Sequence, residues 1–104
     1  MKTLTNPDSL KEHLSGEGKT AVLFVMSACP FCRRFGPLFE AFEKTCAKGL
    51  DLLTVILDDQ DSPLWEEYGI EVVPTVIIFD GGSAISRRDG RPGEGLGAAD
   101  LESL

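Results

Sequence analysis

Continuous apolar runs alternate along the chain with segments in which apolar residues recur every three or four positions. Each change from one pattern to the other marks the boundary of a predicted element. Residues 20–26 (TAVLFVM) and 50–57 (LDLLTVIL) are almost continuously apolar, as expected of strands covered on both faces. Residues 75–79 (TVIIF) form a third, strongly β-branched run. The pattern therefore predicts three buried strands.

Between the first two strands, apolar residues recur at helical spacing. A long helix is predicted from Pro30 to about Lys48, with Phe35, Leu38, Phe39, Phe42 and Cys46 on its apolar face. Pro37 lies inside this helix and should bend it, because proline removes one backbone hydrogen bond.

The remaining predicted elements are shorter. In chain order they are an edge strand over residues 1–5, a helix capped by Asn6 with Pro7 at its first position and ended by Gly16 and Gly18, a short helix over 63–68, a hairpin turn at 80–82, a polar edge strand over 83–88, an irregular glycine-rich segment over 90–97 and a terminal helix over 98–104. Helices thus alternate with buried strands before a hairpin. This order predicts one α/β domain over residues 1–104, a central mixed sheet with helices on both faces.

Composition narrows the function classes. The chain has 104 residues, 42% of them apolar, which is enough for one core without disulfides or a metal. Its 17 acidic and 10 basic residues give a formal charge of −7, which disfavours binding to nucleic acids and anionic membranes. Neither a signal peptide nor a membrane-spanning run is evident, so we expect a cytoplasmic monomer.

Candidate chemistry is concentrated in the segment Cys29-Pro30-Phe31-Cys32. In a reducing compartment, such a pair is more often catalytic or metal-binding than a structural disulfide. Cys29 follows a predicted strand and occupies the predicted N-cap of the long helix, where unpaired N–H groups and the helix dipole stabilise a thiolate. Cysteines in such places have pKa values of about 3.5–7.5, against about 8.5 for a free thiol.

A metal site is the main alternative for this pair. A structural zinc ion needs about four ligands, and the further candidates are Cys46 and His13. Cys46 lies 14 residues beyond Cys32 on one predicted helix, roughly 21 Å away, so the two cannot share an ion. Redox exchange is favoured: Cys29 attacks a substrate disulfide, and Cys32 then resolves the mixed disulfide.

Four features together resemble the thioredoxin family. The CPFC pair stands at a strand-to-helix junction where that family has CGPC, and Pro37 matches its helix-kinking proline. Residues 68–75 (YGIEVVPT) resemble its YGIxxxPT stretch, and Phe79 with Gly82 fall at its FxxG hairpin. The resemblance implies a thioredoxin fold, a cis Val73-Pro74 bond beside the cysteines, and a substrate rim at Val73, Pro74 and Thr75, with Pro30 and Phe31.

Departures from the family pattern bear on mechanism. Leu23 and Val55 align with the buried Asp and its neighbouring Lys, so no buried carboxylate is expected near Cys32. The dipeptide Pro30-Phe31 resembles that of glutaredoxins. We therefore expect a potential nearer the roughly −200 to −230 mV of glutaredoxins than the roughly −270 mV of thioredoxin.

The other notable residues have less specific interpretations. Arg33 and Arg34 either support the thiolate or hold a glutathione carboxylate, or are solvated helix charges. The cluster Arg87, Arg88 and Arg91 and the acidic run 58–61 are predicted to be solvated, and Cys46 to be a buried core thiol.

These observations predict a thiol–disulfide oxidoreductase for protein disulfides, recharged by an upstream reductase or by glutathione and needing no bound cofactor. One alternative is a glutathione-dependent, glutaredoxin-like reductase, in which residues 95–100 (GLGAAD) contact glutathione. A second is a binding module whose cysteines only sense redox state.

Overall fold

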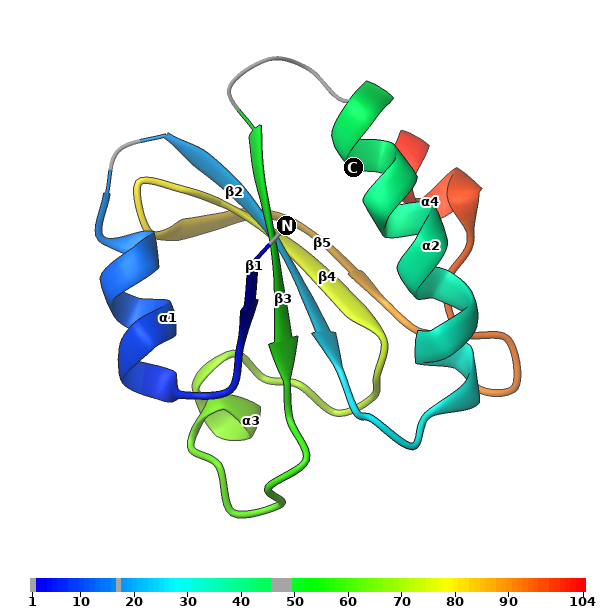
Figure 1. Cartoon of the computed structure of the whole chain (residues 1–104), viewed down its shortest axis with the longest axis horizontal. Coiled ribbons are helices and arrows are strands. Elements are labelled where there is room, and N and C mark those ends of the chain that lie inside the picture. The colour runs from blue at the N-terminus through cyan, green and yellow to red at the C-terminus, as the bar shows by residue number, and fades with distance from the viewer. Residues whose placement is uncertain (1, 17, 46–49) are drawn as a thin grey trace.

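Five strands form one mixed sheet in the order β1-β3-β2-β4-β5 (Figure 1). The computed structural model describes residues 2–16, 18–45 and 50–104. The strand bounds are β1 Lys2–Leu4, β2 Lys19–Val25, β3 Leu50–Ile56, β4 Thr75–Asp80 and β5 Ser83–Asp89. Strands β1, β3 and β2 are parallel, whereas β4 and β5 run antiparallel to their neighbours. The predicted mixed sheet, including the short first strand, is confirmed.

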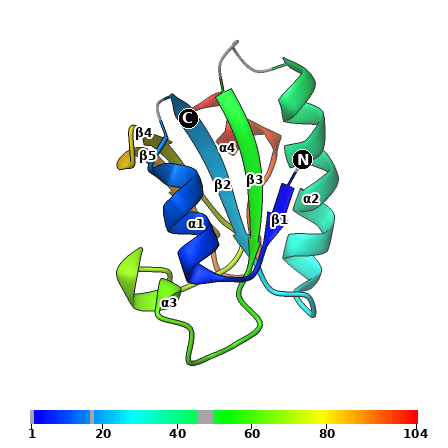
Figure 2. The same cartoon turned by 60° about the vertical axis from the view of Figure 1, so that its left-hand side comes forward.

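Helices cover both faces of the sheet, as predicted (Figures 1 and 2). Their bounds are α1 Pro7–Leu14, α2 Pro30–Thr45, α3 Leu64–Glu67 and α4 Ala98–Glu102. Helices α1 and α3 lie on one face, and α2 and α4 lie on the other. Within the described residues, no helix has the length and apolarity required to cross a membrane.

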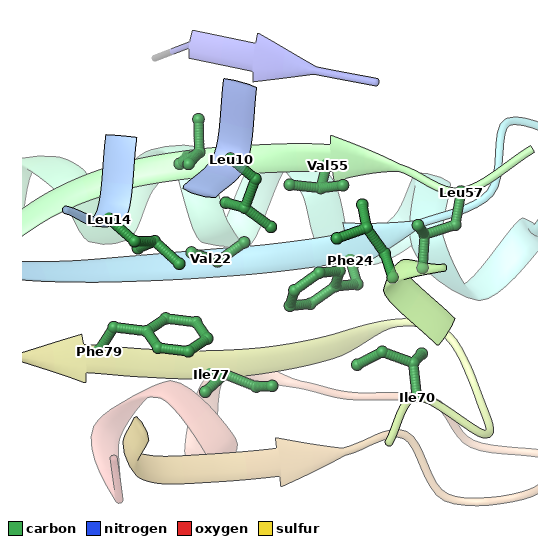
Figure 3. Packing of buried hydrophobic residues seen from close by; sticks show 11 residues of the cluster. Leu10, Leu14, Val22, Phe24, Val55, Leu57, Ile70, Ile77 and Phe79 are labelled. Atoms are coloured by element: carbon green, nitrogen blue, oxygen red, sulfur yellow. The ribbon is translucent and has the colours of Figure 1, made fainter. Parts of the chain in front are cut away.

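Alternation along β2 separates the two halves of the core. Val22 and Phe24 point toward α1 and α3, whereas Ala21 and Leu23 point toward α2 and α4. The first half of the core appears in Figure 3 and comprises Leu10, Leu14, Val22, Phe24, Leu53, Val55, Leu57, Leu64, Ile70, Ile77 and Phe79. The second comprises Ala21, Leu23, Phe35, Phe39, Leu52, Val76, Ile78, Leu96 and Leu101. A strand buried on both faces requires the continuous apolar run seen in the sequence.

Helix boundaries follow local capping chemistry. Asn6 caps α1, because its side-chain Oδ1 accepts the Asp8 N–H at 2.8 Å. The helix ends at Leu14, and the Ser15 N–H closes its last turn onto the carbonyls of Lys11 and Glu12, directly before Gly16, where the end was predicted. Pro37 lies inside α2 as predicted. The predicted end of this helix near Lys48, and the buried thiol at Cys46, lie outside the described residues.

The arginine cluster near the C-terminus is only partly as predicted, because Arg91 is exposed whereas Arg87 and Arg88 are half-buried. Arg87 donates to the carbonyls of Tyr68 at 2.6 Å and Gly69 at 2.9 Å. It also pairs with Asp89 of the same strand at 2.8 Å, so one guanidinium links β5 to the segment after α3. A guanidinium can serve several acceptors at once through its rigid fork of donors. Arg88 donates hydrogen bonds to Ser103, and Arg91 forms ion pairs with Glu94 and Asp100.

Packing of α2 against the sheet is expected to dominate stability. Phe39 is fully buried, whereas its neighbour Leu38 is 39% exposed. We expect Phe39→Ala to lower the free energy of unfolding by about 3–5 kcal/mol, because a buried ring leaves a cavity. Leu38→Ala is the matched control and should change it by about 0.5 kcal/mol. Urea denaturation of the reduced proteins measures both; equal losses would contradict the assigned face of α2.

Candidate active site

Cys29 occupies the N-cap of α2, four residues after the end of β2. Its carbonyl accepts the first helical hydrogen bond, from the Arg33 N–H at 3.1 Å. Its sulfur accepts the Cys32 N–H at 3.2 Å, as the side chain of an N-cap residue does. The backbone therefore directs a hydrogen-bond donor, and the positive end of the helix, at this one sulfur.

Cys32 lies one turn further along and is much less accessible. It is 5% exposed, whereas Cys29 is half-buried, and both are free thiols. Burial, and then its hydrogen bond with Cys29, raise the pKa of the Cys32 thiol to about 12. At neutral pH Cys32 therefore holds its proton, and it must lose that proton before it can act as a nucleophile.

A second segment approaches the cysteines from the start of β4. The Val73-Pro74 bond is cis, which confirms the expectation from the family resemblance. The Cys29 sulfur lies 3.8 Å from the Val73 carbonyl oxygen, toward which its S–H can donate. Two segments separated by 44 residues thus meet at one edge of the sheet.

Only part of the predicted rim is accessible. Pro30 is exposed, and Phe31 and Val73 are half-buried, so these three can contact a substrate. Pro74 is buried and Thr75 is fully buried, so their side chains lie beneath the accessible rim, and their contact with substrate stays a prediction. The Thr75 hydroxyl donates a hydrogen bond to the Val72 carbonyl at 2.7 Å, which stabilises the turn before β4.

Val72 is a rim residue that sequence reasoning missed. It is 36% exposed, although it is apolar, and it precedes Val73 on the same turn. An exposed valine beside a predicted substrate-binding backbone was the available signal. It extends the apolar rim past Val73.

The loop before Cys29 is anchored by a carboxylate from the end of β3. Asp58 accepts the Ser27 N–H at 2.8 Å and the Ser27 hydroxyl at 2.5 Å. These two bonds lower the pKa of Asp58. Arg33 donates its Nε to the Ser27 carbonyl at 3.3 Å. Asp58 was predicted to be solvated; it is exposed, but it also fixes the loop that carries Cys29.

Arg34 contacts Phe31, which lies between the two cysteines in the sequence, and the loop around Glu94. Its guanidinium carbon lies 5.1 Å from the centre of the Phe31 ring, within cation–π range. The same group donates to the Glu94 carbonyl at 2.7 Å, and the backbone of Gly95 lies so close to Phe31 that a Cβ would be 2.8 Å from the Phe31 Cβ. The described hydrogen bonds of Arg33 and Arg34 thus go to backbone carbonyls rather than to the cysteine sulfurs.

Leu23 replaces the buried acid as expected, but the neighbouring position was misassigned. Val55 packs with Phe24 on the α1 side of the sheet, whereas Leu23 faces α2. The residue paired with Leu23 in the register is Thr54. Side chains alternate between faces along a strand, so an alignment shifted by one residue assigns the wrong face. Among the described residues, no group of three or more His, Cys, Asp or Glu side chains is placed to hold a metal ion.

Gly90 supports the rim by close approach. Its N–H donates to the Pro74 carbonyl at 2.9 Å, and a Cβ at residue 90 would lie 2.8 Å from that oxygen. We expect Gly90→Ala to displace the rim and lower the rate of insulin disulfide reduction at least about tenfold, since small misplacements of a site are costly. The control is Gly16→Ala, just after α1, whose added Cβ would make only an ordinary contact of 3.8 Å with the His13 carbonyl oxygen. Unchanged activity in Gly90→Ala would contradict this role.

Comparisons with known proteins agree with this geometry. The family model described as Thioredoxin matches residues 2–99. A thioredoxin of Mycoplasmoides gallisepticum is 35% identical over 91 residues, covering 86% of this chain and 88% of that protein. A protein disulfide-isomerase, tigA of Aspergillus niger, is 28% identical over 101 residues, which are 94% of this chain and 26% of the relative.

Solved structures show the same fold. The crystal structure of Malassezia sympodialis thioredoxin superposes with a TM-score of 0.82 at 25% identity, covering 99% of this chain and 85% of that one. Plasmodium falciparum thioredoxin gives a TM-score of 0.81 at 23% identity, covering 99% and 94%. With the family model matching nearly the whole chain, these findings place the protein in the thioredoxin family of thiol–disulfide oxidoreductases.

Proposed function

We propose that the protein exchanges disulfides with protein substrates, with Cys29 as the nucleophile and Cys32 as the resolving thiol. The observation that carries this assignment is the half-buried Cys29 sulfur at the α2 N-cap, which accepts the Cys32 N–H at 3.2 Å. The Cys29 thiolate attacks a substrate disulfide, forms a mixed disulfide and releases one substrate thiolate. Cys32 then attacks Cys29, and the second substrate sulfur leaves reduced.

An extended peptide is the substrate class that this site suits best. The Val73 carbonyl lies beside the Cys29 sulfur, and apolar Val72 and Pro30 border it. A peptide strand can hydrogen-bond to the Val73 backbone while its cysteine reaches Cys29, in the manner of strand addition. Recognition through backbone groups would make the site tolerant of substrate sequence.

The upstream electron donor is a thiol reductant, either a reductase or glutathione, and we place the reaction in the cytoplasm with the protein as a monomer. The glutathione-dependent alternative relied on the stretch from Gly95 to Asp100. The Asp100 carboxylate is already bound by Arg91, at 2.9 and 3.1 Å, and by the Gly97 N–H at 2.8 Å. Because these bonds already occupy the Asp100 carboxylate, it is poorly placed to bind glutathione. This supports a protein disulfide, rather than glutathione, as the main partner.

Trapping the intermediate tests the assignment of the two cysteines. Cys32→Ser removes the resolving sulfur, so a mixed disulfide between Cys29 and insulin should accumulate. Non-reducing electrophoresis with mass spectrometry of the linked peptide measures it. The accumulated fraction should rise from a few per cent to most of the protein, because the return attack is lost.

Cys29→Ser is the matched control and should give no adduct. A Cys46→Ser change added to Cys32→Ser should leave trapping intact. An adduct formed through Cys46, or equal trapping in Cys29→Ser, would overturn the assignment. Binding of insulin that survives without either active-site thiol, with no reduction by the native protein, would favour the binding module.

The reduction potential should be more oxidising than that of an ordinary thioredoxin. The N-cap hydrogen bond stabilises the reduced Cys29 sulfur, and Pro30 at the first helical position preorganises that cap. We expect equilibration with glutathione buffers to give about −200 to −230 mV, against about −270 mV for thioredoxin. Pro30→Gly should shift the value toward thioredoxin, since it loosens the cap. A native potential below about −270 mV would contradict this expectation.

A further inference from the structure

A cavity of about 290 Å³ lies behind Cys32, between α2 and the strands β1, β2 and β3. Its wall includes Cys32, Gly36 and Glu40 from α2, and Leu23 and Thr54 from the sheet. A single water needs about 10–15 Å³ of such volume and two to four polar partners. The cavity therefore has room for several waters beside the Cys32 side of the disulfide-forming pair.

The resolving step requires a place for a proton. Cys32 is 5% exposed, burial raises the pKa of its thiol, and position 23 carries no acid. Among the described residues, the buried polar side chains are Thr20 and Thr75, and neither hydroxyl is a base at neutral pH. The proton must therefore leave through the cavity rather than to a buried neighbour.

Glu40 is the one carboxylate among the described residues of the cavity wall. It follows Cys32 by eight residues, about 12 Å along the helix axis, which is just over two turns. Glu40 is exposed, and helical side chains incline toward the N-terminus, which is the direction of Cys32 along α2. The remaining gap suits a short chain of waters.

The other groups facing this cavity do not compete for the proton. Arg33 is the second charged residue in the wall, and it is a permanent cation already bonded to the Ser27 carbonyl. The strands and the loop before Cys29 contribute hydroxyl or apolar side chains, namely Thr3, Leu23, Val25, Met26, Ser27, Thr54 and Ile56. Among the described residues of the wall, Glu40 thus carries the one side chain suited to accept this proton.

We propose that Glu40 accepts the Cys32 proton through water in this cavity while Cys32 resolves the mixed disulfide. The Cys32 sulfur then forms its bond to Cys29, and the bond between Cys29 and the substrate sulfur breaks. The electron pair leaves on that substrate sulfur, which takes up a proton from solvent, and Glu40 returns its own proton to water. The cysteine pair is oxidised as the substrate is reduced. This role rests on the proposed assignment of Cys29 and Cys32.

Rapid mixing of the reduced protein with dithiobis(nitrobenzoate) separates the two steps. Attack by Cys29 releases the first nitrothiobenzoate at a rate that depends on reagent concentration. Attack by Cys32 releases the second at a rate that does not. We expect Glu40→Gln to leave the first phase unchanged and to slow the second about 10- to 100-fold at pH 7. This loss lies at or below the lower end of the rate contribution typical of a positioned general base.

The pH profile distinguishes proton acceptance from a structural effect. With Glu40 present, the second phase should depend weakly on pH from about 6 to 9, because the protein rather than hydroxide supplies the base. In Glu40→Gln it should rise about tenfold per pH unit and approach the native rate at alkaline pH, as hydroxide replaces the base. Simple loss of a negative charge would favour the thiolate and speed this phase instead.

Glu43→Gln is the matched control, because it removes the same charge from the same helix at a residue outside the cavity wall. It should leave both phases unchanged. A second phase in Glu40→Gln that equals the native rate at every pH, or that is slowed equally in Glu43→Gln, would overturn the role of Glu40. Loss of the first phase in the native protein would instead contradict the assignment of Cys29.

Discussion

The pairing of β2 with a strand on each side is the constraint from which the rest of the site follows. Parallel β3 and antiparallel β4 both hydrogen-bond to β2, and the register places Phe24 opposite Thr75. The end of β2 and the start of β4 therefore lie at the same edge of the sheet (Figure 1). Cys29 follows β2 and Val73 precedes β4. The pairing of these two strands therefore brings the Cys29 sulfur and the Val73 carbonyl together.

The same pairing sets the different environments of the two thiols. Helix α2 must lie over the face that carries Leu23, since Phe35 and Phe39 are buried there. Its first turn then projects beyond the sheet edge and leaves Cys29 half-buried, while Cys32 faces inward. The difference in accessibility, and the raised pKa of Cys32, thus follow from the packing of one helix. Without an acid at residue 23, the proton of the inner thiol has to travel outward rather than to a neighbour in the core.

Sequence patterns predicted the features that depend on local order. The apolar runs, the N-cap at Asn6 and the position of Cys29 before a helix all follow from neighbours along the chain. Features that depend on distant backbone were missed or misread. Arg87 bonds to carbonyls 18 and 19 residues away, and Asp58 to Ser27, 31 residues away. No periodicity encodes a carbonyl acceptor, and a shift of one residue sufficed to assign Val55 to the wrong face.

The contact between Phe31 and the loop around Gly95 has a consequence for transplanting active sites. The ring lies between the Arg34 guanidinium and the Gly95 backbone, while Arg34 also holds the Glu94 carbonyl. The four residues from Cys29 to Cys32 are therefore not a self-contained cassette. Grafted alone into another scaffold, they would lose the wall against which Phe31 rests. A functional graft would therefore have to transfer the loop around Gly95 together with the tetrapeptide, although the two segments are far apart in the sequence.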